Sequence, residues 1–124
     1  MRHFLDTYAL VEILNGNPAY AEELDGAGTS IYHLFELHVQ VARLRDDETA
    51  DLAFGDLRPL VADVEDADVL AASRFKRAHP KARISYADAL GYSMAQRRAV
   101  AFVTGDSAFR GMDGVRFIAG RSRA

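Results

Sequence analysis

A continuous apolar run at residues 100–104, VAFVT, constrains the fold of this chain most. Such a run is typical of a strand that is buried on both faces, as strands are in parallel sheets covered by helices. Parallel neighbours cannot be joined by tight hairpins and need crossover connections, which are usually helical. The run therefore predicts a layered α/β fold in which helices separate the strands along the chain.

The rest of the chain alternates short apolar runs with segments of helical periodicity. We expect strands at residues 2–5, 29–31, 60–64, 100–104 and 115–118. We expect helices at residues 7–15, 18–25, from 32 to about 45, 46–57, 65–79 and 85–98, with a loop at 26–28. This order predicts a single three-layer α/β/α domain over residues 1–124 with a central, mostly parallel sheet of about four to five strands. Residues 120–124 are expected to form a disordered tail.

Cysteine usage and hydropathy exclude several classes of protein. The chain has no cysteine, which excludes disulfides and thiolate zinc sites. No apolar stretch approaches the roughly 20 residues that span a bilayer. The first residues reach Asp6 before any apolar run develops, so no targeting segment is expected. We therefore expect a cytoplasmic protein that does not contact a membrane.

The net charge of -3 conceals two oppositely charged halves. Residues 1–70 carry 15 acidic and 4 basic side chains, whereas residues 71–124 carry 3 acidic and 11 basic ones. A basic half is suited to binding a polyanion. The basic residues at 74–83, together with Tyr86, could contact RNA. Ordinary solvated surfaces explain the same pattern, and both interpretations remain open.

Two aspartates directly follow predicted strands. Asp6 ends the first strand, and Asp106 follows the 100–104 strand after one glycine. Ligands of open parallel sheets bind at the carboxyl ends of the strands, so both carboxylates are expected at one edge of the sheet. Aspartate is also a good helix N-cap, and capping explains each residue when it is taken singly.

Two further acids give weaker signals. Asp88 lies in the first turn of a predicted helix, between two alanines that leave room for a cation and a substrate. Ser85 and Asp88 also match a capping-box pattern, which explains Asp88 without any function. Glu36 falls outside the apolar arc of its helix, so periodicity alone places it at the surface. That arc comprises Leu34, Phe35, Leu37, Val39, Val41, Ala42 and Leu44.

Each of these acids lies within a short motif, and the motifs follow one another in a definite order. They are FLDTYAL at residues 4–10, TSIYHLFEL at 29–37, YADALG at 86–91 and VTGDSAF at 103–109. In all four, and along nearly its whole length, the chain resembles the PIN-domain family, specifically its VapC type. The fourth motif is the most specific, and the four together are stronger than any one alone.

The resemblance implies a PIN-like fold in which Asp6, Glu36, Asp88 and Asp106 converge on one acidic pocket as catalytic residues and metal ligands. Hard oxygen ligands select Mg²⁺ or Mn²⁺. The implied activity is metal-dependent endoribonuclease cleavage of RNA phosphodiester bonds, which leaves a 5′-phosphate and a 3′-hydroxyl. The implied biological role is the toxin of a type II toxin–antitoxin pair.

The resemblance also implies partners, and the chemistry of two hydroxyls suggests supporting residues. Besides RNA, it implies a VapB-type antitoxin and a second copy of the chain in a homodimer. Thr7 and Thr104 are candidates to orient a ligand carboxylate or a water through their hydroxyls, although Thr104 also suits a strand as an ordinary β-branched residue. His3, His33 and His38 show no metal-ligand spacing with one another, and no role is assigned to them.

Two other functions compete with the nuclease. A haloacid-dehalogenase-like phosphatase also places aspartates after strands, but it needs a second one at the position of Tyr8 and an acid near Phe109 and Arg110. A PIN fold kept only as an RNA- or protein-binding module would be expected to lose motif acids. All four acids are present, which favours the nuclease.

Overall fold

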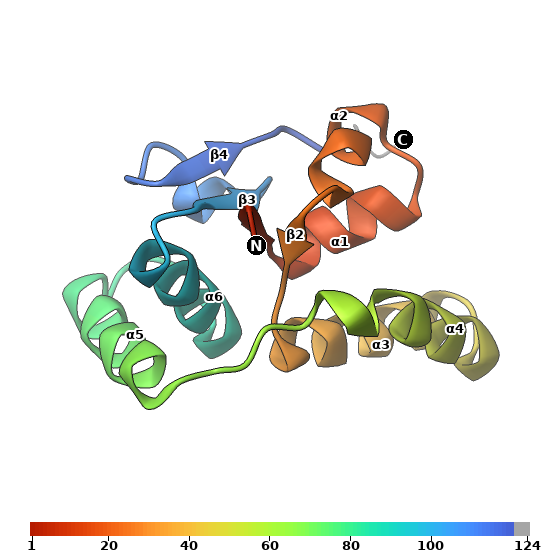
Figure 1. The fold of residues 1–124 in the computed structure, drawn as a ribbon, viewed down its shortest axis with the longest axis horizontal. Helices are drawn as coiled ribbons and strands as arrows, with labels where there is room; N and C mark the ends of the chain where they lie inside the picture. The colour runs from red at the N-terminus through yellow and green to blue at the C-terminus, as the bar shows by residue number, and fades with distance from the viewer. Residues whose placement is uncertain (121–124) are drawn as a thin grey trace.

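The computed structural model describes residues 1–120, so residues 121–124 of the expected tail lie outside it. One parallel sheet forms the centre of the fold (Figure 1). Its strands are β1 (His3–Leu5), β2 (Ala27–Gly28), β3 (Ala101–Thr104) and β4 (Val115–Phe117). They lie in the order β2-β1-β3-β4, which places the first strand of the chain beside a strand formed almost 100 residues later. Four parallel strands confirm the predicted sheet.

Helices fill the intervals between the strands, as predicted. The main helices are α1 (Thr7–Leu14), α2 (Pro18–Ala21), α3 (Ile31–Leu44), α4 (Asp47–Leu57), α5 (Asp66–Ala78) and α6 (Tyr86–Arg97). Three short 3₁₀ turns are η1 (Glu22–Leu24), η2 (Arg58–Leu60) and η3 (Ser107–Phe109). Side-chain caps set the starts of five helices, because Asp6, Asn17, Ser30, Asp46 and Ser85 each accept a hydrogen bond from a backbone N–H of the first turn.

The core has two parts, one on each face of the sheet. Phe4 of β1 pairs with Phe102 of β3, and both rings face α5 and α6. The next residues along, Leu5 and Val103, also pair and face α1 and α3 on the opposite side. Alternate residues of a strand point to opposite faces, so an unbroken apolar run covers both. This arrangement confirms the layered α/β fold.

Two predicted strands and one predicted loop are wrong. The strand expected at residues 29–31 is replaced by the start of α3, because the Ser30 hydroxyl caps that helix. Pairing with β1 falls earlier, on Ala27 and Gly28, where a loop was expected. The strand expected at 60–64 reduces to one bridge between Thr29 and Val61, since Leu60 belongs to η2.

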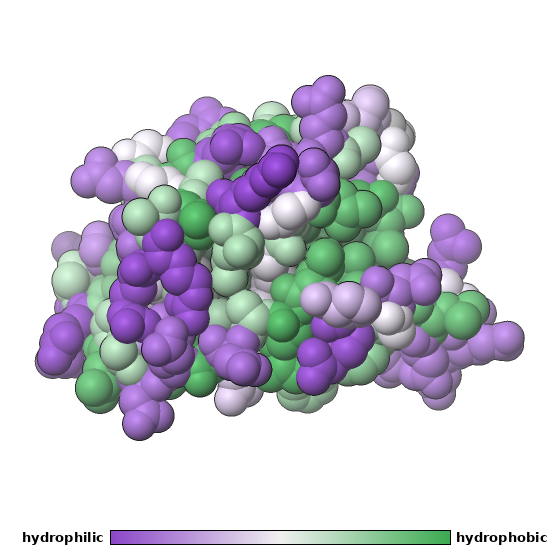
Figure 2. All heavy atoms as spheres, viewed as in Figure 1, coloured by the Kyte–Doolittle hydropathy of each residue, from purple (hydrophilic) through white to green (hydrophobic). Residues whose placement is uncertain are grey.

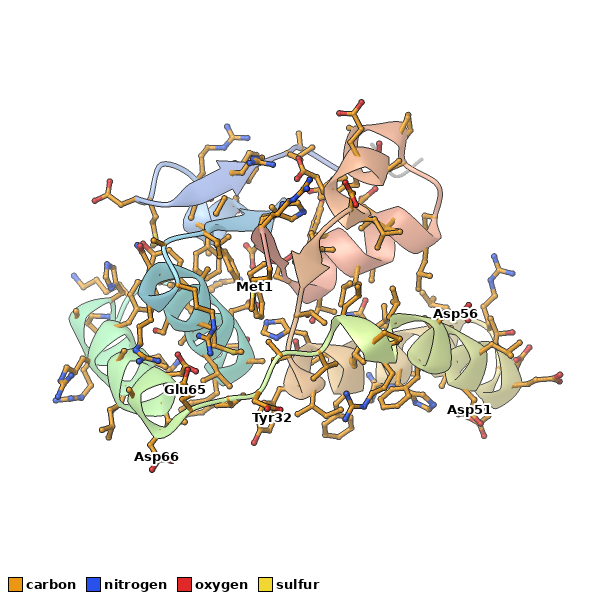
Figure 3. All side chains as sticks on the ribbon, in the orientation of Figure 1. Met1, Tyr32, Asp51, Asp56, Glu65 and Asp66 are labelled. Carbon is orange, nitrogen blue, oxygen red and sulfur yellow. The ribbon has the colours of Figure 1, made fainter. Side chains whose placement is uncertain are left out.

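The surface carries both charged and apolar residues. Figure 3 shows Glu65 and Asp66 at the start of α5 and Asp51 and Asp56 on α4. Apolar residues reach the lower edge of the molecule in Figure 2, where α3 and α5 lie. Phe35 was expected in the core but is 65% exposed. Within residues 1–120, none of the helices is long and apolar enough to cross a membrane.

The buried face of α3 is therefore narrower than the apolar arc of its sequence predicted. Leu34 and Leu37 are buried as expected, but Phe35 and Leu44 are exposed. Phe35 lies outside the face that carries Leu34 and Leu37, whereas Leu44 is the last residue of α3. Apolar type alone did not identify the buried face, because this helix has more apolar residues than its contact with the core requires.

Candidate active site

A pocket of about 330 Å³ opens where β1 and β3 end and where α6 begins. All four predicted acids line it: Asp6, Glu36, Asp88 and Asp106. They come from four places in the chain, namely the end of β1, the first half of α3, the first turn of α6 and the loop after β3. The pocket therefore lies at the carboxyl edge of a parallel sheet, where ligands of such sheets bind.

Asp6 lies at the bottom of this pocket and is only 1% exposed. Its Oδ1 accepts a hydrogen bond of 2.8 Å from the backbone N–H of Ala9, so the expected capping role is present. Burial raises the pKa of the Asp6 carboxyl to about 8, although hydrogen bonds from Thr104 and Ala9 oppose the rise. The charges of Asp88 and Asp106 also contribute to this raised pKa. Capping and a place in the pocket are thus compatible.

Glu36 points into the pocket from α3, on the side of the helix away from its buried leucines. The Thr7 hydroxyl donates to Glu36 Oε1 at 2.7 Å and so fixes the direction of the carboxylate. Periodicity alone placed Glu36 on the open surface, but it is only partly exposed because the N-terminus of α1 packs beside it. The resemblance, rather than the helical pattern, was the signal that found this residue.

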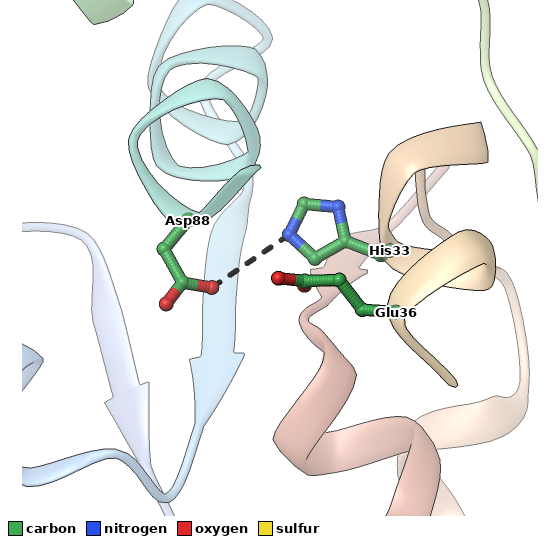
Figure 4. Close-up of side chains that lie close together, drawn as sticks. All are labelled: His33, Glu36 and Asp88. Carbon is green, nitrogen blue, oxygen red and sulfur yellow. Dashed lines mark ion pairs between the residues drawn. The ribbon is translucent and has the colours of Figure 1, made fainter. Parts of the chain in front are cut away.

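Asp88 enters from the first turn of α6, and only part of the expected capping box forms there. The Ser85 hydroxyl accepts a 3.0 Å hydrogen bond from the backbone N–H of Asp88. The Asp88 carboxylate faces Glu36 and His33 of α3 (Figure 4). Burial, together with the charges of Glu36 and Asp106, raises the pKa of Asp88 to about 6.

Asp106 follows β3 and caps the short η3 turn. Its Oδ1 accepts a hydrogen bond from the backbone N–H of Ala108 at 3.0 Å. The hydroxyl oxygen of Thr104 accepts from the backbone N–H of Asp106 at 3.0 Å. Because the Thr104 hydroxyl also hydrogen-bonds Asp6, this buried side chain joins two of the four acids. Thr104 is thus both a β-branched strand residue and a polar contact of the pocket.

Sequence reasoning missed one residue that lines the pocket, Glu12, and one that contacts a pocket acid, His33. Glu12 of α1 lines the pocket and accepts a hydrogen bond from the Asn17 side chain at 2.9 Å. His33 is completely buried, and its Nε2 lies 3.8 Å from Asp88 Oδ1. Pairwise spacing between histidines could not reveal His33, because its neighbours are acids rather than other histidines. Its position three residues before Glu36 was the available signal, since residues three apart on a helix are neighbours.

The pocket meets the requirements of a divalent cation site. Like charges in close proximity repel, and the raised pKa values of Asp6 and Asp88 reflect that repulsion together with burial. One ligand atom each from His33, Glu36 and Asp88 can be chosen so that all lie within 4.8 Å of one another. A cation would relieve the repulsion, and carboxylate oxygens are suitable ligands for Mg²⁺ and Mn²⁺.

Several solved structures have the same fold. VapBC2 from Rickettsia felis, bound to a promoter DNA fragment, aligns with a TM-score of 0.75 at 17% identity, covering 98% of this chain and 100% of that one. VapC20 of Mycobacterium tuberculosis, a sarcin–ricin loop cleaving toxin, aligns with a TM-score of 0.73 at 18% identity, covering 90% of this chain and 95% of that one. VapBC-1 from nontypeable Haemophilus influenzae aligns with a TM-score of 0.73 at 16% identity, covering 96% of this chain and 98% of that one. At these identities the likeness is one of fold.

The sequence comparisons identify the family. No curated protein matches the chain in sequence. Residues 3–115, however, match the family model described as PIN domain, and this range contains all four predicted acids of the pocket. The match separates the chain from the phosphatase alternative considered above. The chain belongs to the PIN-domain family.

Proposed function

We propose that this protein is a metal-dependent endoribonuclease and the toxin of a type II toxin–antitoxin pair. The observation that carries the proposal is the convergence of Asp6, Glu36, Asp88 and Asp106 on one pocket in a PIN-domain chain. The fold shared with VapC20, described as a sarcin–ricin loop cleaving toxin, supports the choice of RNA as the proposed substrate.

The four carboxylates are the groups that would hold the cation, which we propose is Mg²⁺ or Mn²⁺. When bound, such an ion lowers the pKa of a coordinated water and offsets charge on the phosphate that is attacked. Asp6 and Asp88 have raised pKa values and must release their protons before they can act as ligands. The Thr7 hydroxyl keeps Glu36 directed into the pocket, and the Thr104 hydroxyl does the same for Asp6.

The surface beside the pocket is suited to a polyanion. Tyr86, two residues before Asp88, is 83% exposed, and Lys76 Nζ lies 4.6 Å from the centre of its ring. Arg77 and Arg83 are exposed nearby in sequence, on and after α5. We propose that these side chains contact RNA, with Tyr86 available for stacking on an unpaired base.

We further propose an antitoxin partner and a homodimer. The relatives from Rickettsia felis and Haemophilus influenzae are described as VapBC assemblies. Large apolar side chains are exposed on several helices of this chain, among them Phe35 on α3, Leu52 on α4 and Leu70 on α5. Exposed apolar area of this kind is typical of a surface that another chain covers.

Cleavage of a mixed cellular RNA pool by the purified protein tests the activity. We expect cutting with Mg²⁺ or Mn²⁺ and none with EDTA. Asp88→Asn should reduce the rate at least about 100-fold, since it removes a charge from the pocket without removing the Ser85 cap of α6. Asp56→Asn, which changes an exposed carboxylate on α4, is the matched control and should cut normally.

Two results would contradict this proposal. Unchanged cleavage by Asp88→Asn would mean that the acidic pocket is not the active site. No cleavage under any metal, by folded protein freed of bound partners, would favour the non-catalytic binding module instead.

A further inference from the structure

We propose that His33 is a ligand of the cation through Nε2, together with Glu36 and Asp88, and that the site therefore prefers Mn²⁺ to Mg²⁺. The inference rests on the proposed function only in placing a divalent cation in this pocket. It adds a nitrogen ligand to a site that the four motif acids would make purely of oxygen.

The first observation is the distance between the candidate ligand atoms. Nε2 of His33 lies 3.8 Å from Oδ1 of Asp88, and ligand atoms of His33, Glu36 and Asp88 all fall within 4.8 Å of one another (Figure 4). Two ligands bound to the same ion at about 2.1 Å are at most about 4.2 Å apart. The pair of His33 and Asp88 already meets this limit, and a small movement of Glu36 completes the set.

The second observation is that Nε2 of His33 lacks a partner. The residue is 0% exposed, and Nε2 makes no hydrogen bond within the described residues. Buried side-chain nitrogens are nearly always paired, and those that are not need an explanation. The orphaned nitrogen faces carboxylates, and a cation between them would give both a partner.

The third observation is that the imidazole ring is held in place. Nδ1 lies 2.6 Å from the Ser30 hydroxyl, and the ring of Phe4 packs against the imidazole edge-on with centroids 5.1 Å apart. On the α6 side, a Cβ at Gly91 would come within 2.7 Å of His33 Cε1. Gly91 lies one turn after Asp88, so the helix that supplies the carboxylate also leaves the space that admits the ring.

The contact of Nδ1 with Ser30 matches the arrangement that metal-binding histidines usually have. Such histidines hydrogen-bond through one ring nitrogen, which orients the other toward the ion. Here Ser30 is the residue that anchors Nδ1, and it also caps α3 by accepting from the backbone N–H of His33 at 3.3 Å. The start of the helix and the direction of Nε2 are thus set by the same hydroxyl.

The chemistry of imidazole gives the expected selectivity. Carboxylates suit Mg²⁺ and Mn²⁺ alike, whereas imidazole is a softer ligand that favours first-row transition ions. Mg²⁺ also keeps its waters and demands near-ideal octahedral geometry. A mixed nitrogen and oxygen set should therefore strengthen binding of Mn²⁺ more than binding of Mg²⁺.

Spectroscopy of bound Mn²⁺ tests the inference without an activity assay. Metal-free protein is loaded with Mn²⁺ and its pulsed EPR spectrum is recorded for directly coordinated ¹⁴N. We expect a nitrogen coupling in the unaltered protein, which changes to a ¹⁵N pattern when histidine alone is labelled. This measurement needs no variant, so it stands even if substitution of the buried ring prevents folding.

A variant with a matched control measures selectivity. His33→Asn removes Nε2 and keeps a group that can reach Ser30, and His38→Asn changes a partly exposed histidine further along α3. By calorimetry we expect His33→Asn to weaken Mn²⁺ binding about tenfold or more and to change Mg²⁺ binding much less. His38→Asn should bind both ions normally and keep the nitrogen coupling.

The outcomes separate this inference from the proposed nuclease. Mn²⁺ that binds without nitrogen coupling overturns the role of His33 and leaves the nuclease intact. Nitrogen-coupled Mn²⁺ in a protein that cleaves no RNA supports the role of His33 and overturns the nuclease. A protein that binds no Mn²⁺ overturns both.

Discussion

Asp6 combines two roles that place opposite demands on its charge. As the N-cap of α1 it accepts from Ala9, and an ionised carboxylate is the better acceptor. As the deepest acid of the pocket it is cut off from water, which disfavours the charged form and raises its pKa to about 8. Without a cation, the folded protein therefore keeps a proton on Asp6 that the unfolded chain gives up.

This difference predicts how Asp6→Asn affects stability. In the metal-free protein, the raised pKa of Asp6 costs nothing near pH 4 and destabilises the fold increasingly as the pH rises toward 8. The asparagine variant escapes this cost and can still accept from Ala9. We expect its free energy of unfolding to exceed that of the unaltered protein by about 2–4 kcal/mol at pH 8, after allowance for relaxation of the site. Denaturant titrations at several pH values measure the gap, and a gap independent of pH would contradict this account.

Thr7 gives a second prediction at the scale of one residue. Thr7→Val keeps the branched shape but loses the hydroxyl that donates to Glu36 Oε1 at 2.7 Å. Glu36 then lacks its fixed direction, and we expect RNA cleavage to fall about tenfold or more while the helix content stays unchanged. Thr7→Ser, which restores the hydroxyl, should recover most of the rate. Equal rates for the valine and serine variants would show that this hydrogen bond is dispensable.

The sequence identified part of the pocket from physical reasoning alone. Asp6 and Asp106 follow strands, and parallel strands bring their carboxyl ends to one edge. Glu36 and His33 could not be placed in this way, because helical periodicity separates core from surface and does not mark a residue that faces a pocket. Their placement depends on how α3 packs against α1 and α6, which only the tertiary structure shows.

At the scale of whole elements, a buried ion pair joins α5 to α6. Asp68 in the first turn of α5 is 0% exposed, and its Oδ1 accepts from Arg97 at 2.7 Å and from Arg98 at 2.9 Å. Burial alone would raise the pKa of Asp68, but the hydrogen bonds from Arg98, the Glu65 backbone and Arg97 lower it to about 2. Both arginines lie at the end of α6, so this contact holds together the helices that cover one face of the sheet.

Asp68→Asn should therefore destabilise the fold. Two arginines lose their shared charge partner, but both are partly exposed and water compensates in part, so we expect a loss of about 2–3 kcal/mol. Asp66→Asn, at an exposed position in the same helical turn, should change the free energy of unfolding by less than about 1 kcal/mol. Because the pKa of Asp68 is depressed, its contribution is complete above about pH 4 and is lost toward pH 2. A loss as large as this in the Asp66 variant would contradict the assignment.

The elements that the sequence predicted well are those with strong local signals. The helices at α1, α4, α5 and α6 have capping residues or acids at their first turn, and the strand at β3 is continuously apolar. The predicted strand at 29–31 failed because capping by Ser30 outweighs the β-preference of Ile31. The edge strand β2 has only Ala27 and Gly28, two residues with no local preference for a strand. Its formation depends on pairing with β1.

At the scale of the whole molecule, cation binding and folding should be linked. Ligand protons must leave before a cation binds, and the pKa values of about 8 for Asp6 and about 6 for Asp88 place this competition near neutral pH. At a Mn²⁺ concentration of roughly 100 times the Kd at pH 8, we expect the melting temperature to rise by about 10 °C at that pH. At the same Mn²⁺ concentration, the rise at pH 6 should be much smaller. Differential scanning calorimetry measures both, and equal shifts at the two pH values would argue against protonated ligands.

The strand order β2-β1-β3-β4 has a consequence for the synthesis of the protein. The first strand, β1, is central, and its neighbour β3 is made almost 100 residues later. A nascent chain that ends before β3 lacks half of its sheet, and one that ends before Asp106 lacks one wall of its pocket. Chains dominated by such distant pairings cannot complete their fold early. The acidic pocket therefore cannot exist before Asp106 has been synthesised, and translation that stops earlier leaves fragments without a complete pocket.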